Sequence, residues 1–224
     1  MSQYILFCVI SVLVCYLFGS IMCGVILTKL TTNDDVRNHG SGNAGATNVL
    51  RVHGMKAGLI TFAGDMVKCV IAMLLCKYLL ILPAAEGLKL NILLDPQTIM
   101  YYCGFAALIG HSFPIFFQFK GGKAVSSSLG VLLCIDWKIA LAVLLAFIVV
   151  VVLTRIVSIG SIMGALQFII LTFFMSLDMP ILDHLYISRW GLIIGGLVIV
   201  RHKQNIGRLF AGEEKPINLR KQKD

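Results

Sequence analysis

The sequence has 224 residues, of which 58% are hydrophobic and 13% are charged. Its mean hydropathy of +0.90 excludes an ordinary soluble domain and places the chain in a bilayer. The apolar residues form long uncharged runs and do not alternate with polar ones, so we predict an all-α fold and exclude an outer-membrane barrel. The net charge of +8 could suit nucleic acid. Basic loops beside apolar spans are nevertheless the usual mark of membrane topology, so we predict a bilayer partner and no nucleic acid.

Uncharged stretches of about 20 residues predict transmembrane helices. We place seven, near residues 4–28, 57–82, 98–117, 124–135, 138–154, 156–177 and 185–200. The fourth is short enough to be a re-entrant or partial helix. The first lacks a preceding positive side chain and a small-residue cleavage site, so we expect an uncleaved span and not a signal peptide. Without an internal repeat or linker, residues 1–224 are expected to form a single domain.

The distribution of lysine and arginine orients this seven-helix protein. One side receives the basic tail from Arg201 to Lys223 together with Lys29, Arg37, Arg51, Lys56, Lys120, Lys123 and Arg155, and the other side receives Lys89, Lys138 and Arg189. Because basic loops stay in the cytoplasm, the N-terminus is predicted outside and the C-terminus inside. All the polar motifs below then face the cytoplasm, whereas a six-span topology would divide them.

The first polar loop, residues 37–51, has the composition of a phosphate-binding loop. Gly40, Gly42 and Gly45 are spaced so that backbone amides could form an anion nest. Neutral donors and one bidentate cation accompany them, namely Ser41, Asn43, Thr47, Asn48 and Arg51. The alternative is a flexible turn whose charges only set topology. Ala46 stands where a nucleotide-binding P-loop needs lysine, which disfavours a nucleoside triphosphate.

The second polar loop lies within residues 110–128. Gly121 and Gly122 would let the backbone approach a ligand before Lys123, and the predicted helix that follows would direct its positive dipole end at a second anion. His111 could act as an acid or base, or could cap a neighbouring carbonyl.

The last candidates lie in the C-terminal half. Ser158 and Ser161 share one helix face, and His202, Asn205 and Arg208 follow the last span at helical spacing. The alternatives are serines that bond within their own membrane helix and a basic stop-transfer tail.

Two groups inside the apolar runs are assigned structural roles. Asp65 and Lys68, at i and i+3, are expected to form an ion pair that supports the site from below. The cysteines have neither metal-ligand nor CxxC spacing, and we expect them to be small core residues.

Several anion sites on one membrane face indicate two phosphorylated substrates, at least one of them lipid-like. No acidic cluster suits magnesium, so neither a metal nor another cofactor is expected. No histidine is followed five residues later by aspartate. The HxxxxD pattern of acyl-CoA-dependent glycerolipid acyltransferases is therefore absent, and a different acyl donor is indicated.

Four segments together closely resemble the PlsY family of bacterial acyl-phosphate:glycerol-3-phosphate acyltransferases: GSGNAGATNVLR, GHSFPIFFQFKGGKA, TRIVSIGS and RHKQNIGRL. The resemblance runs nearly end to end. It departs at Ala44, where the family often has proline, and at Ala124, where glycine is common. It implies a seven-helix enzyme of the bacterial inner membrane, with its active site facing the cytoplasm, that acylates the sn-1 hydroxyl of glycerol 3-phosphate. The products would be lysophosphatidic acid and phosphate.

The resemblance also implies site residues and partners. The catalytic set would be Ser41, Arg51, Lys123, His202 and Asn205, with Ser161 also binding substrate. The implied partners are acyl phosphate, glycerol 3-phosphate, the bilayer and the soluble enzyme that makes acyl phosphate. Two rival functions are an anion transporter, which would show paired halves and a midplane site, and an adaptor that recruits a soluble enzyme through its basic tail.

Overall fold

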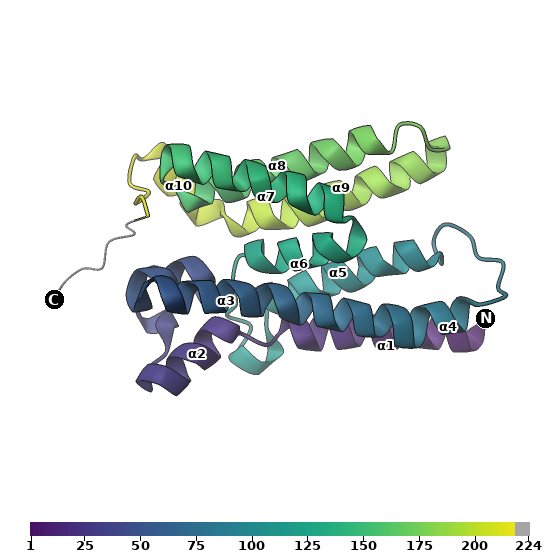
Figure 1. Cartoon of the computed structure of the whole chain (residues 1–224), viewed down its shortest axis with the longest axis horizontal. Coiled ribbons are helices and arrows are strands. Elements are labelled where there is room, and N and C mark those ends of the chain that lie inside the picture. The colour runs from purple at the N-terminus through teal and green to yellow at the C-terminus, as the bar shows by residue number, and fades with distance from the viewer. Residues whose placement is uncertain (218–224) are drawn as a thin grey trace. The chain divides into compact units, whose positions relative to one another are not determined.

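In the computed structural model, residues 1–217 are described, and Arg220, Lys221 and Lys223 of the predicted basic tail lie outside them. The described residues form helices and turns without a strand, which confirms the all-α prediction. Contacts divide the chain into two compact units, residues 1–136 and 137–224. Figure 1 shows the helices of each.

The first unit contains six α-helices and three short helical segments. They are α1 (Ser2–Gly19), α2 (Cys23–Thr32), η1 (Val36–Asn38), α3 (Ala46–Cys76), η2 (Lys77–Ile81), α4 (Leu82–Ala85), α5 (Pro96–Ser112), η3 (Ile115–Phe117) and α6 (Val125–Ile135). Helix α1 packs on α5 and α3, and α6 packs on α3 and α5. The second unit contains α7 (Trp137–Thr154), α8 (Val157–Met175), α9 (Ile181–Arg201) and α10 (Lys203–Phe210), with α8 packed against both α7 and α9.

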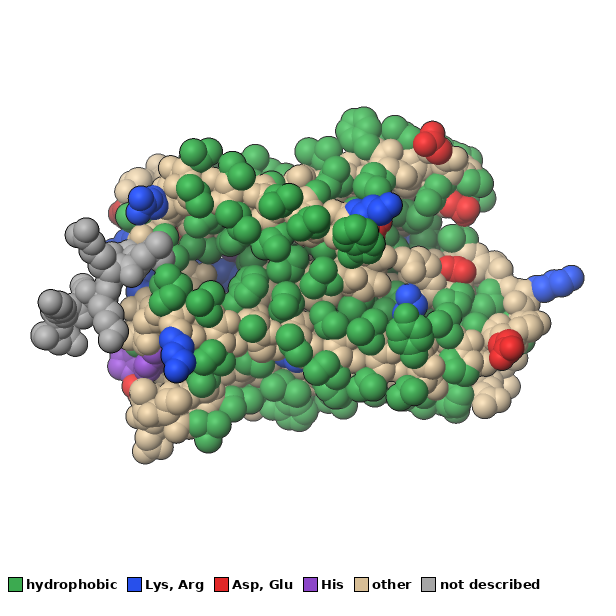
Figure 2. Space-filling model, in the orientation of Figure 1, with side chains coloured by type: hydrophobic (Ala, Val, Ile, Leu, Met, Phe, Trp, Pro, Cys, Tyr) green, Lys and Arg blue, Asp and Glu red, His purple; other side chains and the backbone are tan. Residues whose placement is uncertain are grey.

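Within residues 1–217, six helical segments are long and apolar enough to cross a membrane. They are residues 2–32, 46–85, 96–117, 137–154, 157–175 and 181–201. Their outward side chains are largely hydrophobic: on α7, for example, Val152 and Leu153 are 66% and 77% exposed. Figure 2 shows hydrophobic side chains over most of the visible face. Such exposure suits contact with lipid.

The predicted helix over 4–28 is wrong in one respect, because residues 20–22 interrupt it between α1 and α2. Gly19 lies so close to α5 that an added Cβ would stand 2.1 Å from the carbonyl oxygen of Ala107. The interruption directs the Ile21 carbonyl at the ammonium of Lys68, which donates a hydrogen bond to it. Tertiary contacts therefore specify this break, and the apolar pattern does not reveal it.

The first polar loop, predicted over 37–51, is shorter than expected. Helix α3 begins at Ala46, so the last six residues of the presumed loop 37–51 are helical. At Gly54 the backbone leaves the helical region (φ 86°, ψ 177°). The chain turns back there so closely that a Cβ on Gly58 would stand 2.5 Å from that of Leu50. Only glycine adopts this conformation readily, and it separates the segment that carries Arg51 from the long span.

The cysteines lie where the sequence analysis expects them. Five are buried and two, Cys23 and Cys134, are half-buried, and all seven are free thiols. Their prediction as core residues is confirmed.

The bend at Gly54 predicts a position-specific cost of adding a methyl group. Gly54→Ala should lower the free energy of unfolding by about 1–3 kcal/mol, because alanine is strained at this φ and ψ. Gly196→Ala is the matched control, since Gly196 lies in helix α9 with open space around its Cβ. Thermal unfolding in detergent should show a lower midpoint for Gly54→Ala and an unchanged or slightly higher one for the control. Equal midpoints would contradict the bend.

Candidate active site

Asn48 is the centre of the first polar loop. Its Nδ2 lies within 3.0 Å of the carbonyl oxygens of Val36, His39 and Asn43, and its Oδ1 accepts a hydrogen bond of 2.8 Å from the amide of Ser41. The side chain is buried. One amide group thus joins four points of the loop, so Asn48, which the sequence suggested as a phosphate ligand, shapes the loop in this structure.

The glycines of this loop take part in hydrogen bonds and close contacts within the loop itself. Gly40 and Gly42 have positive φ, as the predicted nest requires, but Gly45 is extended and caps α3. The amide of Gly42 donates to the His39 carbonyl, and that of Gly45 donates to Asn43 Oδ1. A Cβ on Gly40 would stand 2.3 Å from Asn48 Oδ1. These amides therefore bond to the loop and do not point outward as a nest.

Several polar groups of the loop remain available to a ligand. Within residues 1–136, the hydroxyls of Ser41 and Thr47 and the guanidinium of Arg51 have no hydrogen-bond or ion-pair partner. Ser41 and Arg51 are exposed and Thr47 is half-buried. Their chemistry, two hydroxyls and a bidentate cation, suits a phosphate group.

The second polar loop is packed against His111. The amide of Gly122 donates to the His111 carbonyl over 3.0 Å. An added Cβ on Gly121 would stand 2.1 Å from that carbonyl oxygen, and one on Gly122 would stand 2.1 Å from His111 Nε2. Both glycines are thus required by the close approach of the loop to the protein itself. This contact holds the backbone immediately before Lys123.

Helix α6 begins directly after Lys123. Its N-cap is Ala124 in the left-handed region (φ 62°), and no side chain caps the helix. The first-turn amides therefore remain without an intrahelical partner, the arrangement that favours an anion. Ser128 adds a buried Oγ with no hydrogen-bond partner in the described residues. The structure thus places Lys123 beside this helix terminus, as the sequence predicts.

A buried charged cluster lies beneath the second loop. Lys68 Nζ is 2.8 Å from Asp65 Oδ1 and 3.1 Å from His111 Nδ1, and the three residues are at most 6% exposed. The predicted ion pair between Asp65 and Lys68 is confirmed. The ring of His111 belongs to this cluster, so the structure favours its structural role over an acid–base role.

A second polar group lies in the second unit and centres on Glu214, a residue for which the sequence analysis proposes no role. Ser158 Oγ and Asn205 Nδ2 donate to Glu214 Oε1 over 2.8 and 2.6 Å, and Arg208 Nε donates to Oε2 over 2.6 Å. Burial alone would raise the pKa of Glu214, but these hydrogen bonds outweigh it and hold the pKa below its ordinary value. In the sequence, only its position after the basic segment of α10 could have indicated such a role for Glu214.

His202 and Ser161 lie near the same ends of the helices but bond locally. His202 is buried, and its Nδ1 lies 2.7 Å from the carbonyl oxygen of Val198. Because a carbonyl can only accept, Nδ1 carries the proton, and Nε2 is the basic nitrogen of the neutral ring. Ser161 Oγ donates to the Val157 carbonyl over 2.9 Å, as the alternative for a membrane-helix serine expects.

The predicted site residues therefore form two groups. Residues 40–51 and 121–123, together with His111, belong to the first unit, and Ser158, Ser161, His202, Asn205 and Arg208 belong to the second. Among residues 1–217, no three histidine, cysteine, aspartate or glutamate side chains are grouped as metal ligands.

Comparisons with known proteins cover almost the whole chain. The family model described as "Glycerol-3-phosphate acyltransferase" matches residues 9–212. A glycerol-3-phosphate acyltransferase of Nostoc sp. is 41% identical over 220 residues, which are 97% of this chain and 95% of the relative. One from Thermoanaerobacter sp. (strain X514) is 38% identical over 212 residues, 95% of this chain and 96% of the relative.

Two solved structures are also similar. Both are crystal structures of PlsY (YgiH), an integral membrane glycerol 3-phosphate acyltransferase. The glycerol 3-phosphate form has a TM-score of 0.78 at 33% identity and covers 94% of this chain and 96% of its own. The lysophosphatidic acid form has a TM-score of 0.75 at 32% identity and covers 95% and 96%. The chain is therefore a multi-pass membrane protein and an acyltransferase of lipid biosynthesis, and it belongs to the glycerol-3-phosphate acyltransferase (PlsY) family.

Proposed function

We propose that this protein transfers a fatty acyl group from acyl phosphate to the sn-1 hydroxyl of glycerol 3-phosphate, giving lysophosphatidic acid and phosphate. The observation that carries the proposal is the family match across residues 9–212, which includes every candidate site residue. It is supported by the glycerol 3-phosphate and lysophosphatidic acid forms of the similar PlsY. The absence of the HxxxxD pattern supports a donor other than acyl-CoA.

The reaction is a direct displacement. The acceptor hydroxyl oxygen forms a bond to the acyl carbon while the bond from that carbon to the donor phosphate oxygen breaks, and phosphate leaves. Arg51 and Lys123 bind the phosphate groups and offset the charge that builds on the leaving group. Ser41, Ser161, His202 and Asn205 orient the acceptor for attack.

The hydroxyl proton passes to the substrate's own phosphate in this mechanism. A phosphate dianion is basic enough at neutral pH to accept it. His202 is the alternative acceptor through Nε2, since its Nδ1 donates to the Val198 carbonyl. An acyl phosphate is a mixed anhydride with a good leaving group, so no acyl-enzyme is needed.

We further propose seven membrane crossings, with the N-terminus outside, the C-terminus in the cytoplasm and the active site at the cytoplasmic face of the bacterial inner membrane. Helix α6, with 11 residues, extends only about 16 Å at 1.5 Å per residue, roughly half of a 30 Å hydrocarbon core. The loop before it is packed on buried His111, and non-helical backbone is tolerated at depth where protein surrounds it. A short α6 can therefore complete the fourth crossing.

The two compact units are proposed to act as one acyltransferase domain over residues 1–224, because the family match extends across both. Acyl phosphate, its soluble producing enzyme and the bilayer are the proposed partners.

The donor comparison tests the reaction. The purified full chain in lipid cubic phase should release phosphate and form lysophosphatidic acid from palmitoyl phosphate and glycerol 3-phosphate without added metal. Turnover with palmitoyl-CoA alone would reject the donor assignment. No turnover with either donor, in folded protein, would favour the transporter or adaptor.

Removal of a phosphate-binding cation should slow the reaction. Arg51→Ala and Lys123→Ala each remove a charged hydrogen-bonding partner of about 1.5–3 kcal/mol, so the rate should fall roughly ten- to a hundredfold. Lys56→Ala is the control, because Lys56 is an exposed cation only five residues after Arg51, beyond the bend at Gly54. Unchanged rates in both site variants would reject the assignment.

Glu214 should matter through the residues that it positions. Glu214→Ala leaves the amide of Asn205 and the guanidinium of Arg208 without their carboxylate acceptor, which should cost about 1.5–3 kcal/mol and lower activity. The adjacent Glu213 is exposed, so Glu213→Ala is the matched control and should retain both stability and activity. Indistinguishable thermal midpoints and rates for the two variants would contradict this role.

A further inference from the structure

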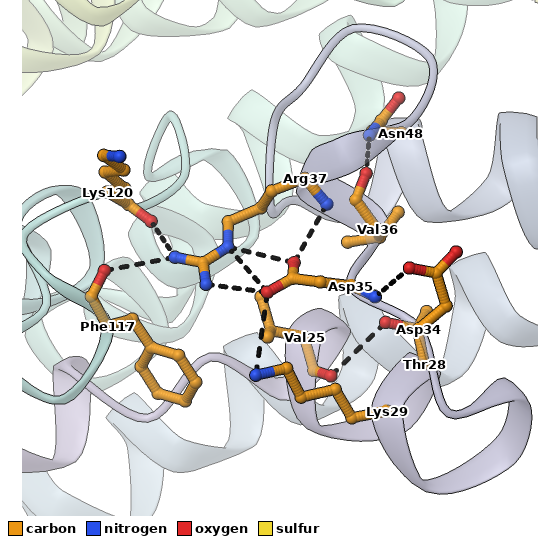
Figure 3. A network of polar contacts seen from close by, with 10 residues as sticks. All are labelled: Val25, Thr28, Lys29, Asp34, Asp35, Val36, Arg37, Asn48, Phe117 and Lys120. Carbon is orange, nitrogen blue, oxygen red and sulfur yellow. Dashed lines mark hydrogen bonds and ion pairs between the residues drawn. The ribbon is translucent and has the colours of Figure 1, made fainter.

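Arg37 joins the two polar loops of the first unit (Figure 3). Its Nη1 donates to the carbonyl oxygens of Phe117 and Lys120 over 3.1 and 3.3 Å. Those carbonyls belong to the second loop, whereas Arg37 belongs to the first. The guanidinium also lies 5.8 Å from the centre of the Phe117 ring. One side chain thus contacts both segments that carry candidate phosphate ligands.

Asp35 orients the guanidinium from the opposite side. Arg37 Nε lies 3.0 and 3.2 Å from the two carboxylate oxygens, and Nη2 lies 2.7 Å from Oδ2. The Asp35 carboxylate also accepts from the backbone amide of Arg37. The hydrogen bonds from Arg37 lower the pKa of Asp35 to about 2. The carboxylate therefore stays ionised, and the guanidinium plane is held with Nη1 facing the second loop (Figure 3).

Both loops are held by hydrogen bonds or close packing next to this contact. Val36, adjacent to Arg37, gives its carbonyl to Asn48, and Asn48 accepts from the Ser41 amide. On the other side, Lys120 precedes the glycine pair that is packed on His111. Ser41 and Lys123 are therefore each fixed within their own loop, and Arg37 connects the two.

The contacts favour a positioning role for Arg37 over that of a further phosphate ligand. Its charge is balanced by Asp35 at 2.7 Å, and three of its nitrogens already donate to oxygens of the protein. The side chain is 19% exposed. Four of its five N–H groups are thus engaged, so bidentate binding of a ligand phosphate would require one of these contacts to break, and the contribution of Arg37 is geometric.

We propose that Arg37, oriented by Asp35, is a positioning residue that sets the distance between the Ser41 loop and the Lys123 loop, so that the two phosphorylated substrates meet in register. This inference rests on the proposed function of those loops. Since each loop is held internally, loss of Arg37 should leave the binding of each substrate largely intact. The chemical step requires both in register, and a misplacement of about 1 Å can cost about a hundredfold in rate.

The network contains a matched control. Lys29 Nζ lies 3.7 Å from the same Asp35 carboxylate, but its side chain is 55% exposed. Within residues 1–136, Lys29 pairs with that carboxylate alone, so Lys29→Gln removes the same charge without removing the link between the loops. An exposed pair of this kind contributes little. Arg37→Lys keeps the charge but lacks the planar fork that reaches Asp35 and two carbonyls together.

The experiment compares Arg37→Gln, Arg37→Lys and Lys29→Gln in the purified full chain. Steady-state rates with palmitoyl phosphate and glycerol 3-phosphate give kcat and both KM values. Amide hydrogen exchange reports on residues 117–123, and thermal unfolding reports on folding. We expect kcat to fall by about ten- to a hundredfold in both Arg37 variants, each KM to change by less than about threefold, and exchange in residues 117–123 to rise. Lys29→Gln should match the parent protein in all three measurements.

Other outcomes overturn the inference. A raised KM with unchanged kcat would make Arg37 a ligand, and full rescue by Arg37→Lys would reduce its role to charge. Unfolding of both Arg37 variants, with Lys29→Gln intact, would assign it to stability alone. If the parent protein is inactive, the proposed function fails, but the exchange comparison still decides whether Arg37 links the loops.

Discussion

The buried ammonium of Lys68 is the interaction on which the first unit depends. A charge inside an apolar bundle is costly unless it is paired and hydrogen-bonded. Lys68 meets this requirement with Asp65 on its own helix, His111 on α5 and the Ile21 carbonyl at the break between α1 and α2. The backbone carbonyl of Asp65 in turn accepts from Ser127 on α6. One charge therefore joins α3 to α5 and to the connection between α1 and α2, and the same turn of α3 contacts α6.

Both polar loops are connected to that cluster, the second directly and the first through the second. The carbonyl of His111 accepts a hydrogen bond from the Gly122 amide, and its ring packs against Gly122. The second loop therefore contacts the same histidine that pairs with Lys68. The first loop is closed by Asn48 and joined to the second by Arg37. This order explains why several hydrogen-bond donors of the loops do not face outward: a loop that must present a few groups accurately uses the others to hold its own shape.

In the second unit the central charged group is a carboxylate, where the first unit has the ammonium of Lys68. Glu214 gathers a serine from α8 and an amide and a guanidinium from α10, and Ile217 donates to the Arg155 carbonyl at the end of α7. The start of the tail is thereby fixed to the helix ends. In both units an ion held by several hydrogen bonds positions neutral and cationic side chains suited to phosphate.

The sequence is sufficient to predict the apolar runs, the Asp65–Lys68 pair at i and i+3 and the four motifs of the family, because each is a local pattern of residue type and spacing. It did not reveal the break at residues 20–22 or the bend at Gly54, since both depend on contacts with residues distant in the chain. It also could not separate Asn48, which holds the loop, from Ser41 and Arg51, whose side chains remain available. The tertiary structure decided these points, because the partner of a hydrogen-bonding group depends on what folding brings within about 3 Å of it.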